Sequence, residues 1–177
     1  IYYTAWMLCL CGLLGMTATG DVFNIFVFLE ISSLSMYLMI GLSRERQALM
    51  AAFSYLVMGT IGATFFLIGV ALLYALTGTL NIEDLAGRLE AIEDSRTVVT
   101  AFAFMVLGIG VKAAVFPLHW WLPNAYRYAP TSATALLGGT ATKVAVYLIV
   151  RFVYDLFGTD FSFQAVELTG MLLASGV

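Results

Sequence analysis

The chain has 177 residues, of which 62% are hydrophobic and 11% are charged, against about 45–50% and about 25% in soluble globular domains. So few charged residues cannot cover a surface in contact with water, which excludes a soluble globular enzyme. A net charge of −3 without a basic stripe excludes a protein that binds nucleic acid. We therefore expect an all-α, polytopic membrane protein in contact with a lipid bilayer.

The few charges divide the chain into apolar segments long enough to cross a membrane. A helix needs about 20 apolar residues to do so, because each residue advances the helix by about 1.5 Å. Both ends of the sequence lie inside apolar runs, so we expect the middle of a longer subunit. We predict a single transmembrane domain, 1–177, with five spans and the truncated start of a sixth: 1–20, 22–43, 48–76, 97–126 (broken near Pro117), 128–150 and 163–177.

Two of the connections between these spans have a recognisable pattern. Ser43–Gln47 is predicted to form a tight turn at a membrane surface. The longer connection, Thr77–Arg96, is acidic, and Asn81 within it is a favoured residue for a helix N-cap. Apolar residues follow Asn81 at helical spacing, namely Ile82, Leu85, Leu89 and Ile92. We therefore predict a short helix that lies on the membrane surface.

Three ionisable residues lie inside predicted spans: Glu30, Lys112 and Lys143. Each costs about 2.5–3.5 kcal/mol at the centre of a membrane helix on insertion scales, so something must compensate. One explanation is structural, either a Glu–Lys pair that fixes helix packing or lysines that extend to the interface. The other is functional: the three side chains line a hydrated proton or ion path, the usual role of ionisable groups within a membrane.

The chemistry of buried acids and bases favours the functional explanation. A medium of low dielectric constant disfavours the charged forms of both carboxyl and amino groups, so that they can exchange protons near neutral pH. A nearby carboxylate keeps a lysine charged, and the lysine releases its proton when that influence is withdrawn. We predict that Glu30 lies opposite Lys112 as a pair of this kind.

The segment Lys112–Pro130 contains Pro117 and Pro123, which makes an unbroken helix improbable because proline removes a backbone donor. A helix that breaks at membrane depth is found where it is buried in protein or lines a cavity, and transporters build ion sites from such helices. The alternative is a surface loop with an interfacial aromatic belt, formed by Trp120, Trp121, Tyr126 and Tyr128. His119 either relays protons or forms a hydrogen bond that holds the helix.

The residues that bind metals and redox cofactors are scarce. His119 is the one histidine, and the two cysteines, Cys9 and Cys11, lie in an apolar run. We therefore predict no metal site, no cofactor, no disulfide and no catalytic residue in this chain.

Three stretches of the sequence carry the pattern of a known family. The first is Thr19–Asn24 (TGDVFN), followed by Glu30, and the second is Leu76–Asn81 (LTGTLN). The third is Lys112–Arg151, with a lysine, PLHxWLP, AP, and an apolar helix containing TKxxxY and an arginine. In order and spacing they resemble the antiporter-like subunits of respiratory complex I, of membrane-bound hydrogenases and of Mrp-type multisubunit cation/proton antiporters.

The resemblance implies a fold, a location and roles for three residues. The spans would be helices four to eight, with the start of nine, of a roughly fourteen-helix multi-pass subunit of the cell (inner) membrane. Five of these helices would form one complete repeat, which an inverted copy follows in the family. Glu30 resembles the glutamate that modulates the pair, Lys112 the lysine at the break of a discontinuous helix, and Lys143 the lysine that passes protons towards the centre of the subunit.

Two departures from the family pattern bear on function. Asn124 stands where the family usually has Asp, and Tyr126 where complex I and hydrogenase members often have His. These departures lean towards the D-type subunit of Mrp antiporters, and thus towards proton movement coupled to Na⁺ exchange beside other membrane subunits. The alternatives are a proton-pumping subunit of a redox-driven translocase of the NADH:quinone oxidoreductase or hydrogenase type, and a subunit that is only a structural scaffold.

Overall fold

The computed structural model describes residues 1–43, 45–92, 95–159 and 161–162, and its regular elements in these ranges are helical. This confirms the predicted all-α, polytopic fold. The elements, in chain order, are α1 (Tyr2–Ala18), α2 (Val22–Gly41), α3 (Arg46–Thr77), α4 (Ile82–Leu89), α5 (Arg96–Ala113), α6 (Leu122–Tyr128), α7 (Thr131–Leu136), the π-helical turn η1 (Leu137–Ala141), α8 (Thr142–Arg151) and the π-helical turn η2 (Phe152–Leu156).

Four helices of the described residues are long and apolar enough to cross a membrane. They are α2, α3, α5 and the continuous helix Thr131–Leu156, a rod in which η1 joins α7 to α8 and η2 extends α8. The apolar helix α1 occupies the first predicted span and has 17 residues. The predicted sixth span, 163–177, lies outside the described residues.

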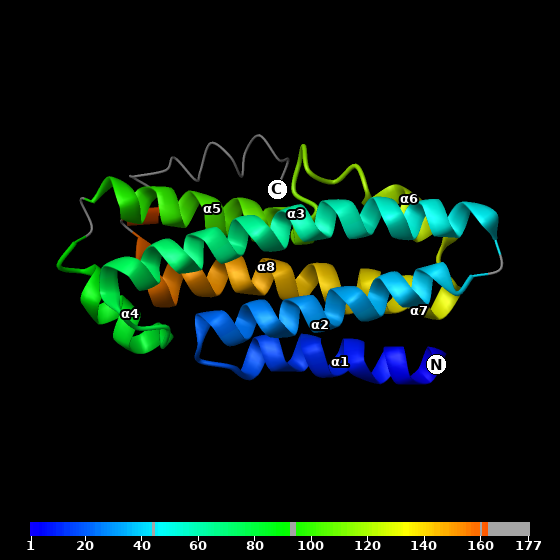
Figure 1. Cartoon of the computed structure of the whole chain (residues 1–177), viewed down its shortest axis with the longest axis horizontal. Coiled ribbons are helices and arrows are strands. Elements are labelled where there is room, and N and C mark those ends of the chain that lie inside the picture. Colours follow the sequence, from blue (N-terminus) through cyan, green and yellow to red (C-terminus); the bar gives the residue numbers. More distant parts are fainter. Residues whose placement is uncertain (44, 93–94, 160, 163–177) are drawn as a thin grey trace.

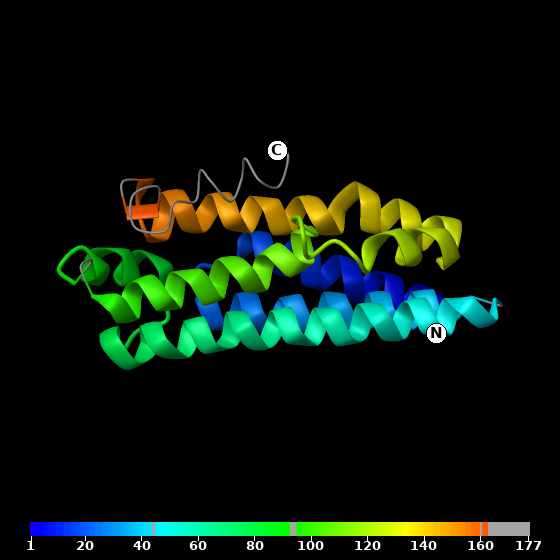
Figure 2. The same cartoon turned by 90° about the horizontal axis from the view of Figure 1, so that it is seen from above.

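The helices run alternately up and down in a bundle (Figures 1 and 2). α1 and α2 form a hairpin, α3 packs against α2 and α5, and α8 packs against α5 and α1. Glycines bring α3 and α5 close together, since a Cβ atom on Gly62 would lie 2.9 Å from the carbonyl oxygen of Gly108. Small residues allow this close backbone approach between membrane helices.

At one end of the bundle the α1–α2 turn is tied to the α3–α4 turn. The backbone N–H of Val22 donates to the Leu80 carbonyl, and that of Ile82 donates to the Gly20 carbonyl, each at 2.9 Å. Arg151 adds a third link, from its Nη1 to the Thr19 carbonyl at 2.6 Å. These contacts fix the ends of α1, α2, α3 and α8 relative to one another.

The short helix predicted after Asn81 is α4. The Asn81 side chain accepts hydrogen bonds from the backbone N–H groups of Glu83 (3.0 Å) and Asp84 (3.2 Å), as an N-cap does. Its apolar side is buried through Ile82, Leu85 and Leu89.

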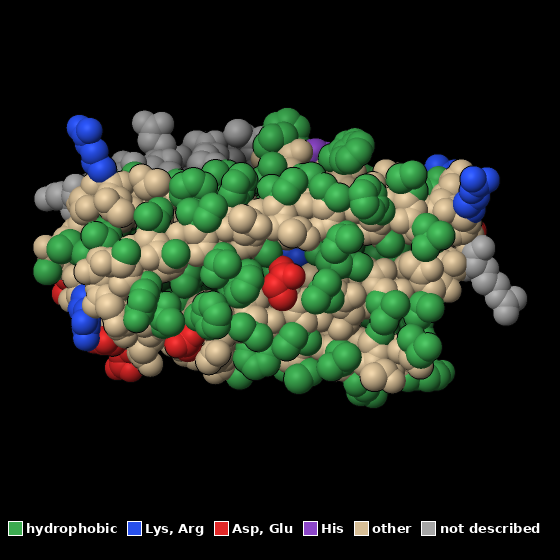
Figure 3. All heavy atoms as spheres, viewed as in Figure 1, with side chains coloured by type: hydrophobic (Ala, Val, Ile, Leu, Met, Phe, Trp, Pro, Cys, Tyr) green, Lys and Arg blue, Asp and Glu red, His purple; other side chains and the backbone are tan. Residues whose placement is uncertain are grey.

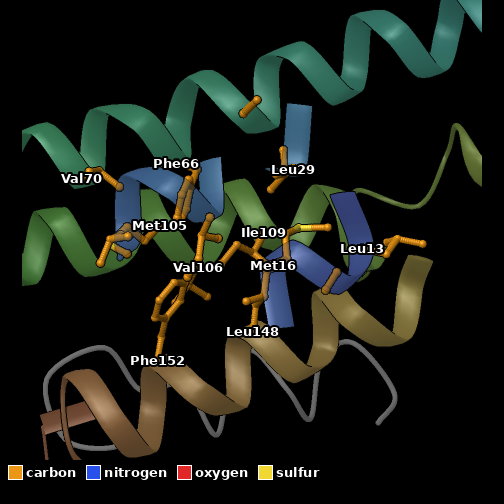
Figure 4. Close-up of a cluster of buried hydrophobic side chains, with 14 of the residues drawn as sticks. Leu13, Met16, Leu29, Phe66, Val70, Met105, Val106, Ile109, Leu148 and Phe152 are labelled. Carbon is orange, nitrogen blue, oxygen red and sulfur yellow. The ribbon is translucent and has the colours of Figure 1, made fainter. Parts of the chain in front are cut away.

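The centre of the bundle is a cluster of apolar side chains contributed by five helices. Figure 4 shows Leu13 and Met16 of α1, Leu29 of α2, Phe66 of α3, Met105 and Ile109 of α5, and Leu148 of α8 pointing towards one another. The face seen in Figure 3 carries many hydrophobic side chains, and its charged side chains gather towards the two ends, apart from an acidic side chain near the middle. Such a surface suits a bilayer, and the chain is a multi-pass membrane protein.

Candidate functional site

Lys112 lies in the last turn of α5 and is buried, with 8% of its surface exposed. Its Nζ donates a hydrogen bond to Ser33 Oγ at 2.5 Å and another to Tyr37 Oη at 3.0 Å. Both acceptors belong to α2, where they stand one helical turn apart. Two neutral hydroxyl groups therefore hold the amino group of Lys112.

Aromatic rings form the rest of its surroundings. The Nζ lies 5.5 Å from the centroid of the Tyr37 ring and 5.8 Å from that of Tyr55 on α3, within the range of a cation–π interaction. Tyr55 meets Tyr37 edge-on, with centroids 4.6 Å apart, and stacks on Trp121 at 4.0 Å. The three rings make a wall that excludes water from one side of the ammonium group.

The wall is attached to the break after α5. The helix ends at Ala113, and Ala114 adopts a left-handed conformation with φ 56°. Trp121 then folds back, and its Nε1 donates to the Val111 carbonyl at 3.0 Å, which satisfies a carbonyl of the last helical turn. The predicted discontinuous helix is confirmed.

The alternative of an interfacial belt is wrong for one of its four residues. Trp121 is 1% exposed and packs beside the lysine, whereas Trp120 is exposed. The wall needs a ring whose polar N–H can reach a backbone carbonyl, and Trp121 supplies it.

Glu30 shares the face of α2 that carries Ser33 and Tyr37, but it does not touch Lys112. Among the described residues the two ion pairs within 4.0 Å are Arg88–Asp84 and Arg151–Asp155, so the predicted Glu30–Lys112 pair is not a direct ion pair. Glu30 is half-buried, and its Oε1 is buried without a hydrogen-bond partner. The position next to the lysine is occupied by Ser33 and Tyr37, which follow Glu30 on the same helix face.

A cavity of about 30 Å³ lies beside the lysine. On the same measure a water molecule needs about 10–15 Å³ and a few polar partners, so the cavity has room for water. Its walls come from α1, α2, α3, α5 and the η1–α8 rod, and they include Cys9, Ser32, Ser33, Lys112, Ala141 and Ala145. The cavity therefore extends from Lys112 to the wall formed by α8.

Lys143 lies on α8 but on its exposed side, so the structure does not bring it together with Lys112. Its Nζ donates to the Gly138 carbonyl within η1. This π-helical turn ends at Ala141, which lines the cavity, two residues before the exposed lysine. π-Helical turns inside α-helices are frequent at functional sites.

The remaining predicted residues lie apart from the lysine. His119 is exposed and stacks on Phe116, with ring centroids 5.6 Å apart. Pro117 lies in the connection between α5 and α6, and Pro123 lies in the first turn of α6, where its missing N–H costs no hydrogen bond. The described residues contain no group of three or more His, Cys, Asp or Glu side chains that could hold a metal ion.

Sequence reasoning missed Ser33, Tyr37 and Tyr55 as neighbours of the lysine. Ser33 donates to the Leu29 carbonyl at 2.6 Å while accepting from Lys112. One signal was available, because Glu30, Ser33 and Tyr37 follow the i, i+3, i+7 spacing of one helix face.

Comparisons with known proteins agree on one family. A family model described as "NADH:quinone oxidoreductase/Mrp antiporter, TM" matches residues 19–177. The chain is 48% identical to "NADH-quinone oxidoreductase subunit N" of Desulforudis audaxviator over 153 residues, which are 86% of this chain and 30% of that protein. It is 35% identical to the D-type subunit of an Na(+)/H(+) antiporter of Alkalihalophilus pseudofirmus over an alignment of 180 positions that covers 99% of this chain and 36% of that protein.

A solved structure supports the same relationship. The chain superposes on a chain of the membrane-bound sulfane sulfur reductase, an archaeal respiratory membrane complex, with a TM-score of 0.86 and 37% identity. The match covers 98% of this chain and 35% of that one. The chain thus spans about a third of the length of the proteins it matches.

Proposed function

Because the chain belongs to the NADH:quinone oxidoreductase/Mrp antiporter membrane family, we propose that it is part of a subunit that translocates protons through Glu30, Lys112 and Lys143. The observation that carries this proposal is the setting of Lys112. It is a buried amino group, held by the hydroxyls of Ser33 and Tyr37 at the edge of a cavity with room for water. A lysine that only fixed helix packing would gain from a direct carboxylate partner.

In this proposal Lys112 alternates between its charged and neutral forms. The charged form donates to Ser33 and Tyr37 and lies against two aromatic rings, and all these contacts favour it. The Glu30 carboxylate favours it further through space, so a change in the position or protonation of Glu30 alters how readily Lys112 releases its proton. The proton leaves towards the side of the lysine that faces the cavity.

Lys143 is the next residue of the path. The η1–α8 rod lines the cavity with Ala141 and Ala145 and carries Lys143 on its other side. The π-helical turn places a backbone carbonyl, that of Gly138, within reach of the Lys143 amino group. In this proposal Lys143 takes part in passing the proton on towards the rest of the subunit.

The proton movement is coupled to exchange of a monovalent cation, Na⁺, within a multisubunit Mrp-type antiporter of the cell (inner) membrane. Two observations support this coupling. Asn124 and Tyr126 depart from the family pattern, and one relative is named as the D-type subunit of an Na⁺/H⁺ antiporter. The partners are then other membrane subunits, protons and Na⁺.

A second candidate has its own support. The relative named NADH-quinone oxidoreductase subunit N shares 48% identity with this chain, which favours a redox-driven proton pump whose electron transfer takes place in other chains. Both candidates use the same proton path. A pure scaffold is disfavoured, because a scaffold gains stability when buried charges are replaced by apolar residues.

The test uses the full-length parent complex in sealed vesicles. Under an imposed pH gradient, the Mrp-type function predicts that Na⁺ or K⁺ collapses the gradient and that Lys112→Ala abolishes this collapse. The redox-driven function predicts no collapse with either cation, but acidification when an electron donor is supplied.

Arg88→Ala is the matched control. Arg88 is a cation of the same chain, but it lies on α4 and pairs with Asp84 away from the cavity. An assembled Lys112→Ala complex that moves protons as fast as the Arg88→Ala complex would refute the path.

A further inference from the structure

We propose that Tyr37 is a positioning residue for Lys112, and that Gly59 lacks a side chain so that the Tyr37 hydroxyl can reach the ammonium group. The inference rests on the proposed function, since it concerns the lysine of that path. It assigns a role to two residues that lie outside the Glu30, Lys112 and Lys143 set.

The first step is the fixed position of the Tyr37 hydroxyl. The ring is 8% exposed, and the edge-on contact with Tyr55 at 4.6 Å holds it. Tyr55 is in turn stacked on Trp121, which is bonded to the backbone next to Lys112. A hydroxyl on a ring held in this way leaves the lysine little freedom to move.

The second step is the packing of α3 at Gly59. A Cβ atom there would overlap the Tyr37 hydroxyl and would lie 3.0 Å from both the Tyr37 Cζ and the Lys112 Nζ. The space that a side chain would fill on α3 is therefore occupied by the hydroxyl group that accepts from Lys112. Any residue larger than glycine must displace the acceptor, the ammonium group, or both.

The third step is the direction in which the ammonium group points. Ser33 and Tyr37 accept two of its three N–H groups, and the rings of Tyr37 and Tyr55 cover another side. What remains open is the cavity lined by Ser32, Ala141 and Ala145. Tyr37 thus directs the remaining N–H group of the Lys112 ammonium towards the cavity. No carboxylate in the part of the chain that the structure describes is bonded to the ammonium group to do so.

The experiment compares Tyr37→Phe, Gly59→Ala and the double variant in the full-length complex in sealed vesicles. Proton movement is started with the agent, either a cation or an electron donor, that moves protons in the wild-type complex. Tyr37→Phe keeps the ring and removes the acceptor, so we expect the maximal rate of proton movement to fall about tenfold. The concentration of this agent at half-maximal rate and the amount of assembled complex stay unchanged, which separates positioning from a folding defect.

Gly59→Ala is expected to lower the rate further than Tyr37→Phe does, because the added methyl group also presses on Lys112. In the double variant the overlapping hydroxyl is absent, but the methyl group still lies 3.0 Å from the Lys112 Nζ. We therefore expect a rate above that of Gly59→Ala and below that of Tyr37→Phe, a non-additive result. Gly62→Ala is the matched control on α3, since its Cβ would press on the Gly108 carbonyl and Val111, away from the Tyr37 hydroxyl. Tyr37→Phe should not rescue that variant.

Two outcomes overturn the inference without touching the proposed function. They are a Tyr37→Phe complex with the wild-type rate, and a double variant no faster than Gly59→Ala, while Lys112→Ala remains inactive. If Gly59→Ala does not assemble, the Tyr37→Phe rate still decides. Proton movement that survives in Lys112→Ala would refute the proposed function itself.

Discussion

Replacing Ser33 with alanine should slow proton movement, whereas the same change at Ser32 should not. The two serines are neighbours on α2, both are buried, and both donate to the Leu29 carbonyl. Both also line the cavity. Their side-chain hydrogen bonds differ in one respect, because only Ser33 accepts from Lys112, at 2.5 Å. The pair therefore isolates the contribution of that single hydrogen bond.

The size of the effect follows from the type of bond. A hydrogen bond to a charged group contributes about 1.5–3 kcal/mol, and each 1.36 kcal/mol is about a factor of ten in an equilibrium or a rate. The cavity has room for water that can partly replace the lost acceptor, so the lower end of the range applies. We expect the rate in Ser33→Ala to fall about tenfold, and that in Ser32→Ala to stay within about twofold of the wild type.

The assay is the initial rate of pH change inside sealed vesicles, divided by the amount of assembled complex. Equal rates in Ser33→Ala and Ser32→Ala would refute the reasoning, because the hydrogen bond to Lys112 would then contribute nothing to transport.

Three further predictions concern the surroundings of the site. Trp121→Phe keeps a ring against Tyr55 but removes the hydrogen bond to the Val111 carbonyl, which keeps only the one from the Ala114 N–H at 3.3 Å. Thermal unfolding of the complex should therefore show a loss of about 0.5–1.5 kcal/mol; an unchanged Tm would contradict this. Arg151→Met removes the link to the Thr19 carbonyl, and hydrogen exchange should speed up in the α1–α2 turn while the centre of α2 stays protected. Hydrogen bonding from Arg88 lowers the pKa of Asp84 below its ordinary 3.8. This pair therefore supports α4 above about pH 4, and its contribution is lost as the pH falls through the lowered pKa. Hydrogen exchange in α4 that already speeds up between pH 7 and 5 would argue against this.

The composition and the spacing of charges predicted most of the fold. Long uncharged runs can satisfy their backbone only as helices in a bilayer, so the helical spans followed directly from the sequence. Pro117 and Pro123 predicted the break after α5, and Asn81 predicted the start of α4, because both effects are local backbone chemistry.

The surroundings of Lys112 could not be predicted to the same depth. In a helix that is apolar all round, the sequence does not tell which face meets lipid and which meets protein. Tyr37, Tyr55 and Trp121 were therefore indistinguishable from packing or interfacial aromatics. The π-helical turn at Leu137–Ala141 and the exposed side chain of Lys143 depend on tertiary packing in the same way.

The most direct test of the central claim is proton movement in the assembled full-length complex with Lys112→Ala, measured beside Arg88→Ala in sealed vesicles under the same driving force. The account predicts that the Lys112→Ala complex assembles and moves no protons, while the Arg88→Ala complex keeps the wild-type rate. Proton movement at the wild-type rate in assembled Lys112→Ala would contradict the account.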